Sequence, residues 1–215
     1  MSWKGLIALM VAFTFASAPA VAKTVKLVAF GDSLTAGYNL PRSDSFSAQL
    51  ETALRAKGYD VSVANAGVSG DTTTGGLARL DWSVPADTDG VILELGANDM
   101  LRGLNPDIPR KALTEIVTRL KARNIPILLA GMRASTNMDA AYRKAFDSIY
   151  PELAQKYDLL LYPFFLEGIV GNRTLTLPDG LHPTARGVAR VVSGILPKAE
   201  ELIAKAGGTK ATGPQ

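Results

Sequence analysis

The sequence predicts an α/β fold in which helices cover a five-stranded, mostly parallel sheet. Short apolar runs typical of buried strands alternate along the chain with longer segments whose apolar residues recur at helical spacing. Strands and helices that alternate in this way form βαβ units, which give a doubly wound parallel sheet. The composition, 47% hydrophobic and 20% charged, suits one domain with a sizeable core.

The first strand is predicted at residues 25–30, where β-branched and aromatic residues form a short apolar run that ends at a glycine. Asp44 and Ser45 then offer a cap for a helix over residues 46–57, which a second glycine ends. The chain therefore turns sharply after its first strand and enters its first long helix some residues later.

A second strand at residues 61–64 leads into a glycine-rich loop, residues 65–72, and then into a helix that runs through Leu80. We interpret Asp71-Thr72-Thr73 as the cap of this helix, because short oxygen-bearing side chains satisfy the free N–H groups of a first helical turn.

The third strand is predicted at residues 90–95 and ends in Gly96-Ala97-Asn98-Asp99. Residues 107–123 carry apolar side chains on one helical face and precede a fourth strand at residues 125–130.

The last three elements are a helix, a short strand and a closing helix, at residues 139–157, 159–162 and 183–206. Pro197 lies inside the closing helix and is expected to kink it, because proline lacks the N–H that a helix interior needs.

The N-terminal segment is typical of a secretory signal peptide. Lys4 precedes an apolar run over residues 5–18, and Ala20-Val21-Ala22 supplies the small residues of a cleavage site. The run is shorter than the roughly 20 apolar residues that a membrane span needs. We therefore expect cleavage near Ala22 and a mature protein in the periplasm or outside the cell, with no stable membrane span.

These observations predict that the chain has three parts. They are a signal peptide over residues 1–22, a single domain over residues 23–206 and a flexible, polar, glycine-bearing tail over residues 207–215.

A serine and the only histidine of the 215 residues stand at opposite ends of the predicted domain. Ser33 follows the first strand, at the carboxyl edge where open α/β sheets bind ligands. Serine is a weak nucleophile that needs an adjacent base, usually a histidine oriented by a carboxylate. Although Gly31-Asp32-Ser33 alone is equally typical of a polar turn, only His182 can be the base, and Asp179 lies three residues before it. Together they predict a catalytic triad.

Three loops at the carboxyl ends of the first three strands each offer one hydrogen-bond donor. The donors are the backbone N–H groups of Ser33 and Gly67 and the carboxamide of Asn98. Singly, a glycine in such a loop is more often only a bend, and Asn98 with Asp99 is also a common helix start. Because their convergence would stabilise the oxyanion of a tetrahedral intermediate, we predict an oxyanion hole.

The sequence resembles the SGNH, or GDSL-type, serine hydrolases. The four blocks of that family occur in order: Gly31-Asp32-Ser33-Leu34, the loop with Gly67, Gly96-Ala97-Asn98-Asp99 and Asp179-Gly180-Leu181-His182. The resemblance covers residues 25–205. Residues 65–80, 94–103 and 145–165 look like the periplasmic thioesterase I/lysophospholipase L1 subgroup, whose members are often named arylesterases.

This resemblance implies a flavodoxin-like, three-layer α/β/α sandwich. It also implies that Ser33 is the nucleophile, that Asp179 and His182 complete the triad, and that Gly67 and Asn98 complete the oxyanion hole with the Ser33 amide. The implied activity is hydrolysis of short to medium acyl or aryl esters through an acyl-enzyme, with thioesters and lysophospholipids as further substrates.

Other classes of protein fit less well. With no cysteine and one histidine, thiolate catalysis and a zinc site lack ligands, and we expect neither a metal nor a cofactor. Scattered arginines and lysines form no basic stripe, so nucleic acid is not an expected partner. One alternative is a non-catalytic flavodoxin-like module in which residues 31–37 cradle a phosphate, but Asp32 would repel it. Another is a carbohydrate acetylesterase of the same family.

The expected partner is a small acyl ester or thioester held in an open groove. No lid domain is apparent, and we predict that the groove is walled by residues 100–109, 132–138 and 164–170. Within the last segment, a run such as Phe164-Phe165-Leu166 beside a strand is also typical of a core.

We interpret Asp32 as a buried carboxylate that binds its own loop, and Glu94 as a structural acid that needs a partner the sequence does not identify.

Overall fold

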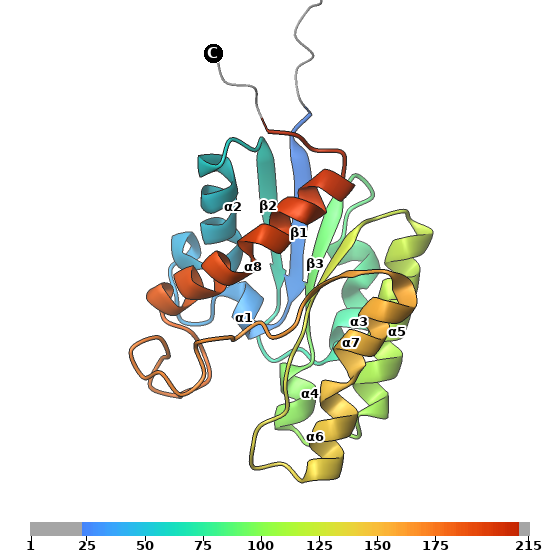
Figure 1. The fold of residues 1–215 in the computed structure, drawn as a ribbon, viewed down its shortest axis with the longest axis vertical. Coiled ribbons are helices and arrows are strands. Elements are labelled where there is room, and N and C mark those ends of the chain that lie inside the picture. Colours follow the sequence, from blue (N-terminus) through green and yellow to red (C-terminus); the bar gives the residue numbers. More distant parts are fainter. Residues whose placement is uncertain (1–22, 211–215) are drawn as a thin grey trace, which may run out of the picture.

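The computed structural model describes residues 23–210 and contains a five-stranded sheet (Figure 1). Its strands are β1 (Val25–Gly31), β2 (Val61–Gly67), β3 (Gly90–Glu94), β4 (Ile127–Ala130) and β5 (Leu160–Tyr162). They lie in the order β2-β1-β3-β4-β5, and each neighbouring pair is parallel. This is the flavodoxin-like order. The order in which strands are added to the sheet reverses between β1 and β3, and ligands bind at the carboxyl ends of those two strands.

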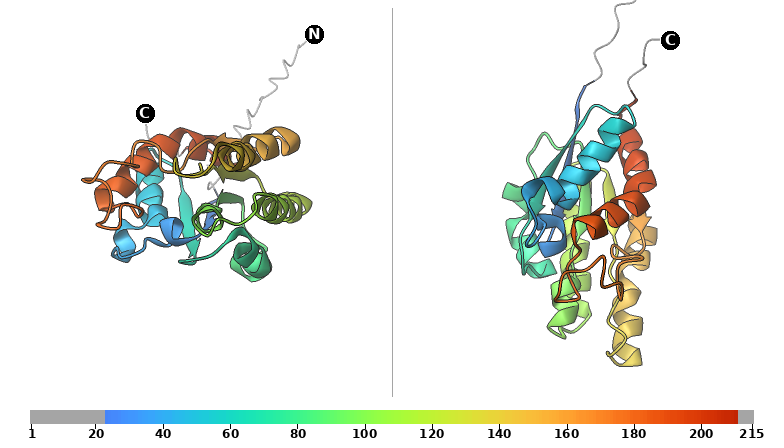
Figure 2. Two further views of the ribbon diagram at one scale, coloured as in Figure 1. Left: turned by 90° about the horizontal axis from the view of Figure 1, so that it is seen from below. Right: turned by 90° about the vertical axis from the view of Figure 1, so that its left-hand side faces the viewer.

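Helices cover both faces of this sheet. They are α1 (Ser33–Ala36), α2 (Phe46–Ala56), α3 (Thr73–Ser83), α4 (Ala97–Leu101), α5 (Asp107–Ala122), α6 (Ala140–Asp147), α7 (Ile149–Tyr157) and α8 (Ala185–Lys205), with a 3₁₀ turn at Arg42–Asp44. The α2 and α8 helices pack on one face, and α3, α5 and α7 pack on the other. The short α1, α4 and α6 follow β1, β3 and β4, and α4 and α6 form the lower end of the molecule in Figure 1 and in the right-hand view of Figure 2. The predicted three-layer sandwich is confirmed.

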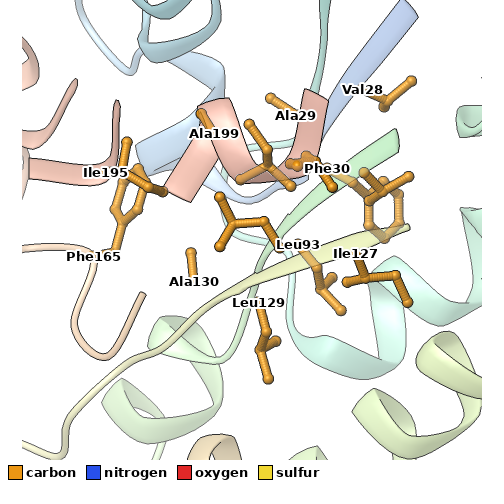
Figure 3. Close-up of a cluster of buried hydrophobic side chains, with 14 of the residues drawn as sticks. Val28, Ala29, Phe30, Leu93, Ile127, Leu129, Ala130, Phe165, Ile195 and Ala199 are labelled. Atoms are coloured by element: carbon orange, nitrogen blue, oxygen red, sulfur yellow. The ribbon is translucent and has the colours of Figure 1, made fainter. Parts of the chain in front are cut away.

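The core lies between the sheet and its helices. Phe30 of β1 and Leu93 of β3 are fully buried, and so are Ile195 and Ala199 of α8 (Figure 3). Burial of each large apolar side chain contributes about 1.5–3 kcal/mol to the stability of the folded state. Phe165, which follows β5, belongs to the same cluster.

The predicted helix over residues 139–157 is in fact two helices, α6 and α7, that meet at Ser148. Pro151 lies in the first turn of α7, where it has no N–H to donate to the carbonyl four residues earlier, and this explains the break. Pro197, by contrast, does not interrupt α8.

The described residues cover the two predicted terminal segments to different extents. The predicted signal peptide, residues 1–22, lies outside the described residues. At the other end, Lys210 pairs with Tyr59 in an isolated antiparallel bridge, and the rest of the predicted tail, residues 211–215, lies outside the described residues. Along residues 23–210, no helix is both long and apolar enough to cross a membrane.

Candidate active site

The structure brings Ser33, His182 and Asp179 into one line of hydrogen bonds. Ser33 opens α1 directly after β1, and His182 lies in the loop that leads into α8. The His182 Nε2 lies 2.9 Å from the Ser33 Oγ, and its Nδ1 lies 2.7 Å from the Asp179 Oδ2. An Nδ1–H that donates to the carboxylate leaves Nε2 free to accept the serine proton, which is the arrangement of a Ser-His-Asp triad.

A tight turn holds Asp179 against the imidazole. The second carboxylate oxygen, Oδ1, accepts hydrogen bonds from the backbone N–H groups of Leu181 (2.9 Å) and His182 (3.0 Å). Partial burial alone would raise the pKa of Asp179, but the two N–H groups and the imidazole outweigh burial and lower it. The carboxylate is therefore ionised at neutral pH, where it orients the imidazole.

Asp32 shapes the turn that carries Ser33. It is fully buried, and its Oδ1 caps α1 by accepting a hydrogen bond from the Leu34 N–H at 3.0 Å. Burial raises the pKa of Asp32 to about 6, although the Leu34 N–H and the Asn98 amide oppose this shift. The interpretation of Asp32 as a buried carboxylate that binds its own loop is confirmed.

Glu94 ties the same turn to β3. Its Oε2 accepts hydrogen bonds from the Thr35 hydroxyl at 2.7 Å and from the Asp32 N–H at 3.3 Å, and these are the partners that the sequence did not identify. Its Oε1 is buried without a hydrogen-bond partner among the described residues. Burial and the nearby Asp32 carboxylate raise the pKa of Glu94 well above its usual value, which favours the protonated form.

The raised pKa of Glu94 predicts how stability changes with pH. A folded state that binds a proton more tightly than the unfolded state loses stability as pH rises from about 4.3 toward the raised pKa. Glu94→Gln removes this penalty, so the variant should gain stability relative to the parent chain as pH rises. Melting temperatures of the two proteins, measured in steps across this range, test the prediction. Parallel curves would show that Glu94 has an ordinary pKa.

Asn98 contacts the turn formed by Asp32 and Ser33. It lies in α4, after Gly96, whose φ of +120° and close contact with Tyr150 exclude a side chain, because a Cβ there would lie 2.1 Å from the Tyr150 hydroxyl. The Asn98 Nδ2 donates one hydrogen bond to the Asp32 Oδ2 at 3.1 Å. This hydrogen bond fixes the carboxamide beside the turn that carries Ser33.

Gly67, the third predicted donor, packs directly against α1. A Cβ at this position would lie 2.2 Å from the Ala36 N, so only glycine fits here. Its own N–H donates to the Asn65 Oδ1 at 3.0 Å, within a local turn. An oxyanion at this N–H would therefore have to share it with the Asn65 carboxamide or displace that carboxamide. The sequence did not predict this hydrogen bond between Gly67 and Asn65.

Arg79 supports the site, although nothing in the sequence singled it out. The guanidinium is buried, and it donates to the carbonyls of Gly31 (2.8 Å), the last residue of β1, and Ala66 (2.9 Å), the residue before the last of β2. Its Nε donates to Asp71 at 2.6 Å, and its Cζ lies 4.3 Å from the centre of the Phe30 ring. Arg79 thus holds the ends of β1 and β2 together next to Ser33.

The predicted helix cap Asp71-Thr72-Thr73 is wrong in two of its three residues. Thr72 alone caps α3, accepting a hydrogen bond from the Gly75 N–H at 3.2 Å. Asp71 pairs with Arg79, and the Thr73 hydroxyl donates to Asp99 at 2.7 Å. Both side chains bind residues that are close only in the folded chain, so they are not available to the helix terminus.

A cavity of about 350 Å³ opens beside Ser33 and His182. Its walls include Met100, Leu101, Met132, Arg133, Ala134, Ser135, Thr136, Phe164, Leu166, Ile169 and Val170, from the three predicted segments. Thr176, Gly180 and Leu181 also line it, although the sequence did not indicate them. Phe165 is 1% exposed and belongs to the core, whereas Phe164 faces the cavity.

The mouth of this cavity is apolar and open. Leu101, Val170 and Leu181 line it and remain 50%, 64% and 47% exposed, respectively. Within residues 23–210, no group of three His, Cys, Asp or Glu side chains is arranged to hold a metal ion. The site thus combines a serine hydroxyl, an imidazole in contact with it and an apolar pocket that suits an acyl or aryl group.

Comparisons with known proteins agree with this geometry. A model of the GDSL-like lipase/acylhydrolase family matches residues 29–190. The chain is 38% identical to an arylesterase of Vibrio mimicus, over 83% of this chain and 88% of that protein. It is 39% identical to thioesterase 1/protease 1/lysophospholipase L1 of Escherichia coli (strain K12), over 73% of this chain and 74% of that protein. Among solved structures, the SGNH-hydrolase family esterase AlinE4 is similar, with a TM-score of 0.72 and 47% identity, over 85% of this chain and 98% of that one.

Proposed function

Because this chain belongs to the GDSL-like lipase/acylhydrolase family and is an SGNH serine esterase, we propose that it hydrolyses short to medium acyl and aryl esters through an acyl-enzyme on Ser33. The observation that most supports this proposal is the 2.9 Å contact between the Ser33 Oγ and the His182 Nε2. This contact lies at the wall of the apolar cavity, where a substrate carbonyl would be bound.

The reaction has two halves that use the same base. In the first, the Ser33 Oγ attacks the carbonyl carbon while the His182 Nε2 accepts the hydroxyl proton, which it then donates to the departing alcohol. In the second, a water molecule attacks the acyl carbon while the His182 Nε2 accepts its proton, and His182 then returns this proton to the Ser33 Oγ as the carboxylic acid leaves. Asp179 stabilises the imidazolium that forms in both halves.

The oxyanion of each tetrahedral intermediate is proposed to lie between the Ser33 N–H, the Gly67 N–H and the Asn98 carboxamide. The Asp32 carboxylate accepts one N–H of Asn98, which fixes the carboxamide before substrate arrives. A donor that is already oriented costs no reorganisation when charge develops.

Asn98→Ala should therefore lower kcat by about a hundred- to a thousandfold, with little change in KM, because the lost hydrogen bond forms mainly in the transition state. Steady-state kinetics with p-nitrophenyl butyrate measure both constants. Met100→Ala, on the same helix and in the cavity wall, is the control, and it should act through KM for longer acyl groups. An Asn98→Ala effect confined to KM would make Asn98 a substrate-binding residue.

The open mouth of the cavity predicts weak discrimination by chain length. Each buried methylene contributes only about 0.8 kcal/mol, so kcat/KM over a p-nitrophenyl ester series should rise gently and peak between about four and ten carbons. Val170→Ser, at the exposed rim, should reduce kcat/KM for the octanoyl ester more than for the acetyl ester. Strict activity on acetyl groups, including those of an acetylated sugar, would replace this proposal with a carbohydrate acetylesterase.

Thioesters and lysophospholipids are proposed as further substrates, because the similar Escherichia coli protein is named for both activities. We also propose that the protein acts in the periplasm or outside the cell, since residues 1–22 have the composition of a signal peptide. The mass of the protein recovered from cells tests the second point, because cleavage near Ala22 would leave Lys23 at the N-terminus.

A further inference from the structure

Tyr38 lies against the imidazole of the proposed catalytic base. The centres of the Tyr38 and His182 rings are 4.4 Å apart, and their planes are inclined by 35°. Tyr38 follows Gly37, which ends α1, and its N–H donates to the Ser33 carbonyl at 3.1 Å. The residue therefore connects the helix of the nucleophile to a base from the far end of the chain.

We propose that Tyr38 is a positioning residue for His182, whose ring fixes the tilt of the imidazole and favours the imidazolium formed during the reaction. This inference rests on the proposed function, because it assigns Tyr38 to the same reaction at Ser33. Nothing in the sequence distinguished Tyr38 from any other tyrosine in a loop.

The contacts of the imidazole explain why a third neighbour is needed. The Ser33 Oγ and the Asp179 Oδ2 both bind His182 through its ring nitrogens, at the edge of the ring. Hydrogen bonds at the edge leave the ring free to tilt about the line that joins them. A second ring packed 4.4 Å away restricts this motion and covers one face of the imidazole.

The charge of the base changes during the reaction, and Tyr38 responds to that change. The face of an aromatic ring attracts a cation within about 6 Å of its centre and attracts a neutral ring less. The interaction therefore strengthens as the proton moves from Ser33 to His182, and a difference of this kind raises kcat. The carboxylates that also act on this imidazolium are Asp179, in contact with it, and Asp32, beneath the turn.

Direct contact with substrate does not explain the position of Tyr38. The side chain is 42% exposed and is not one of the residues that line the cavity. Its removal should thus leave KM unchanged, whereas loss of a cavity wall would raise KM.

The test compares Tyr38→Leu and Tyr38→Phe with the parent enzyme. Tyr38→Leu should lower kcat for p-nitrophenyl butyrate by about 3- to 30-fold and slow labelling by a fluorophosphonate probe to the same extent, with KM unchanged. Tyr38→Phe keeps the ring and should restore both rates. Trp82→Leu makes a similar change at a 75% exposed aromatic residue outside the cavity and is the matched control.

Two further measurements separate positioning from simple packing. Fluorinated phenylalanines at position 38 keep the ring shape but weaken its attraction for a cation, so kcat should fall stepwise with each added fluorine. In NMR spectra, the C–H resonances of the only histidine should lose their ring-current shift in Tyr38→Leu and keep it in Tyr38→Phe.

The outcomes distinguish this inference from the proposed function. An unlabelled parent enzyme would reject the proposed function, while the NMR comparison would still report whether the two rings pack together. An active parent whose kcat is unchanged in Tyr38→Leu, or a loss that appears in KM alone, would overturn the inference. A kcat that does not respond to fluorination would overturn the part that concerns the imidazolium.

Discussion

His182→Ala is expected to lower kcat by about a millionfold, the loss found when a triad base is removed. The 215 residues contain no second histidine, so no other imidazole can take its place beside the Ser33 hydroxyl. Without a base at the 2.9 Å contact, the hydroxyl stays protonated and is a poor nucleophile. Labelling by a fluorophosphonate probe should accordingly disappear within an ordinary assay time.

The control for this experiment is the double variant Ser33→Ala/His182→Ala. Residues that act as a unit lose activity together, so the double variant should be no less active than either single variant. A matching melting temperature would show that the fold is intact, which is expected because His182 lies in a loop at the edge of the domain. Retention of more than about a hundredth of the activity would reject His182 as the base.

Asp179→Asn is expected to lower kcat by about ten-thousandfold while leaving the fold unchanged. The asparagine carbonyl can still accept the N–H groups of Leu181 and His182, which preserves the turn. Its amide, however, would donate to the Nδ1 of His182, so the remaining imidazole proton moves to Nε2. That nitrogen could then no longer accept the proton of Ser33.

Asp179→Ala separates the two tasks of this carboxylate. The alanine variant should lose both activity and stability, because the Leu181 and His182 N–H groups lose their acceptor as well. Steady-state kinetics and thermal melting of the two variants test this expectation. An asparagine variant within tenfold of the parent enzyme would show that Asp179 is structural and that another group orients the imidazole.

Local pattern was enough to predict most of the fold. Apolar runs and helical spacing recur along the chain, and an alternating order of strands and helices permits few topologies, so the parallel sheet and its two helical layers followed. The one helix that was predicted wrongly, over residues 139–157, also had a local signal, since Pro151 breaks it in two. The short α1 and α4 were missed because a single turn of helix has too few residues to show a period.

The sequence by itself also determined which residue types could perform the chemistry, because it has one histidine, no cysteine and a serine at the end of a strand. The tertiary structure alone decided which groups surround these residues. Thr35 donates a hydrogen bond to Glu94, Arg79 donates to the carbonyls at the strand ends, Asn65 accepts the Gly67 N–H, and the Tyr38 ring packs against His182. Hydrophobic burial follows a repeating pattern that a sequence displays. A buried polar group needs only some partner, and which side chain satisfies it depends on how distant segments meet when the sheet closes.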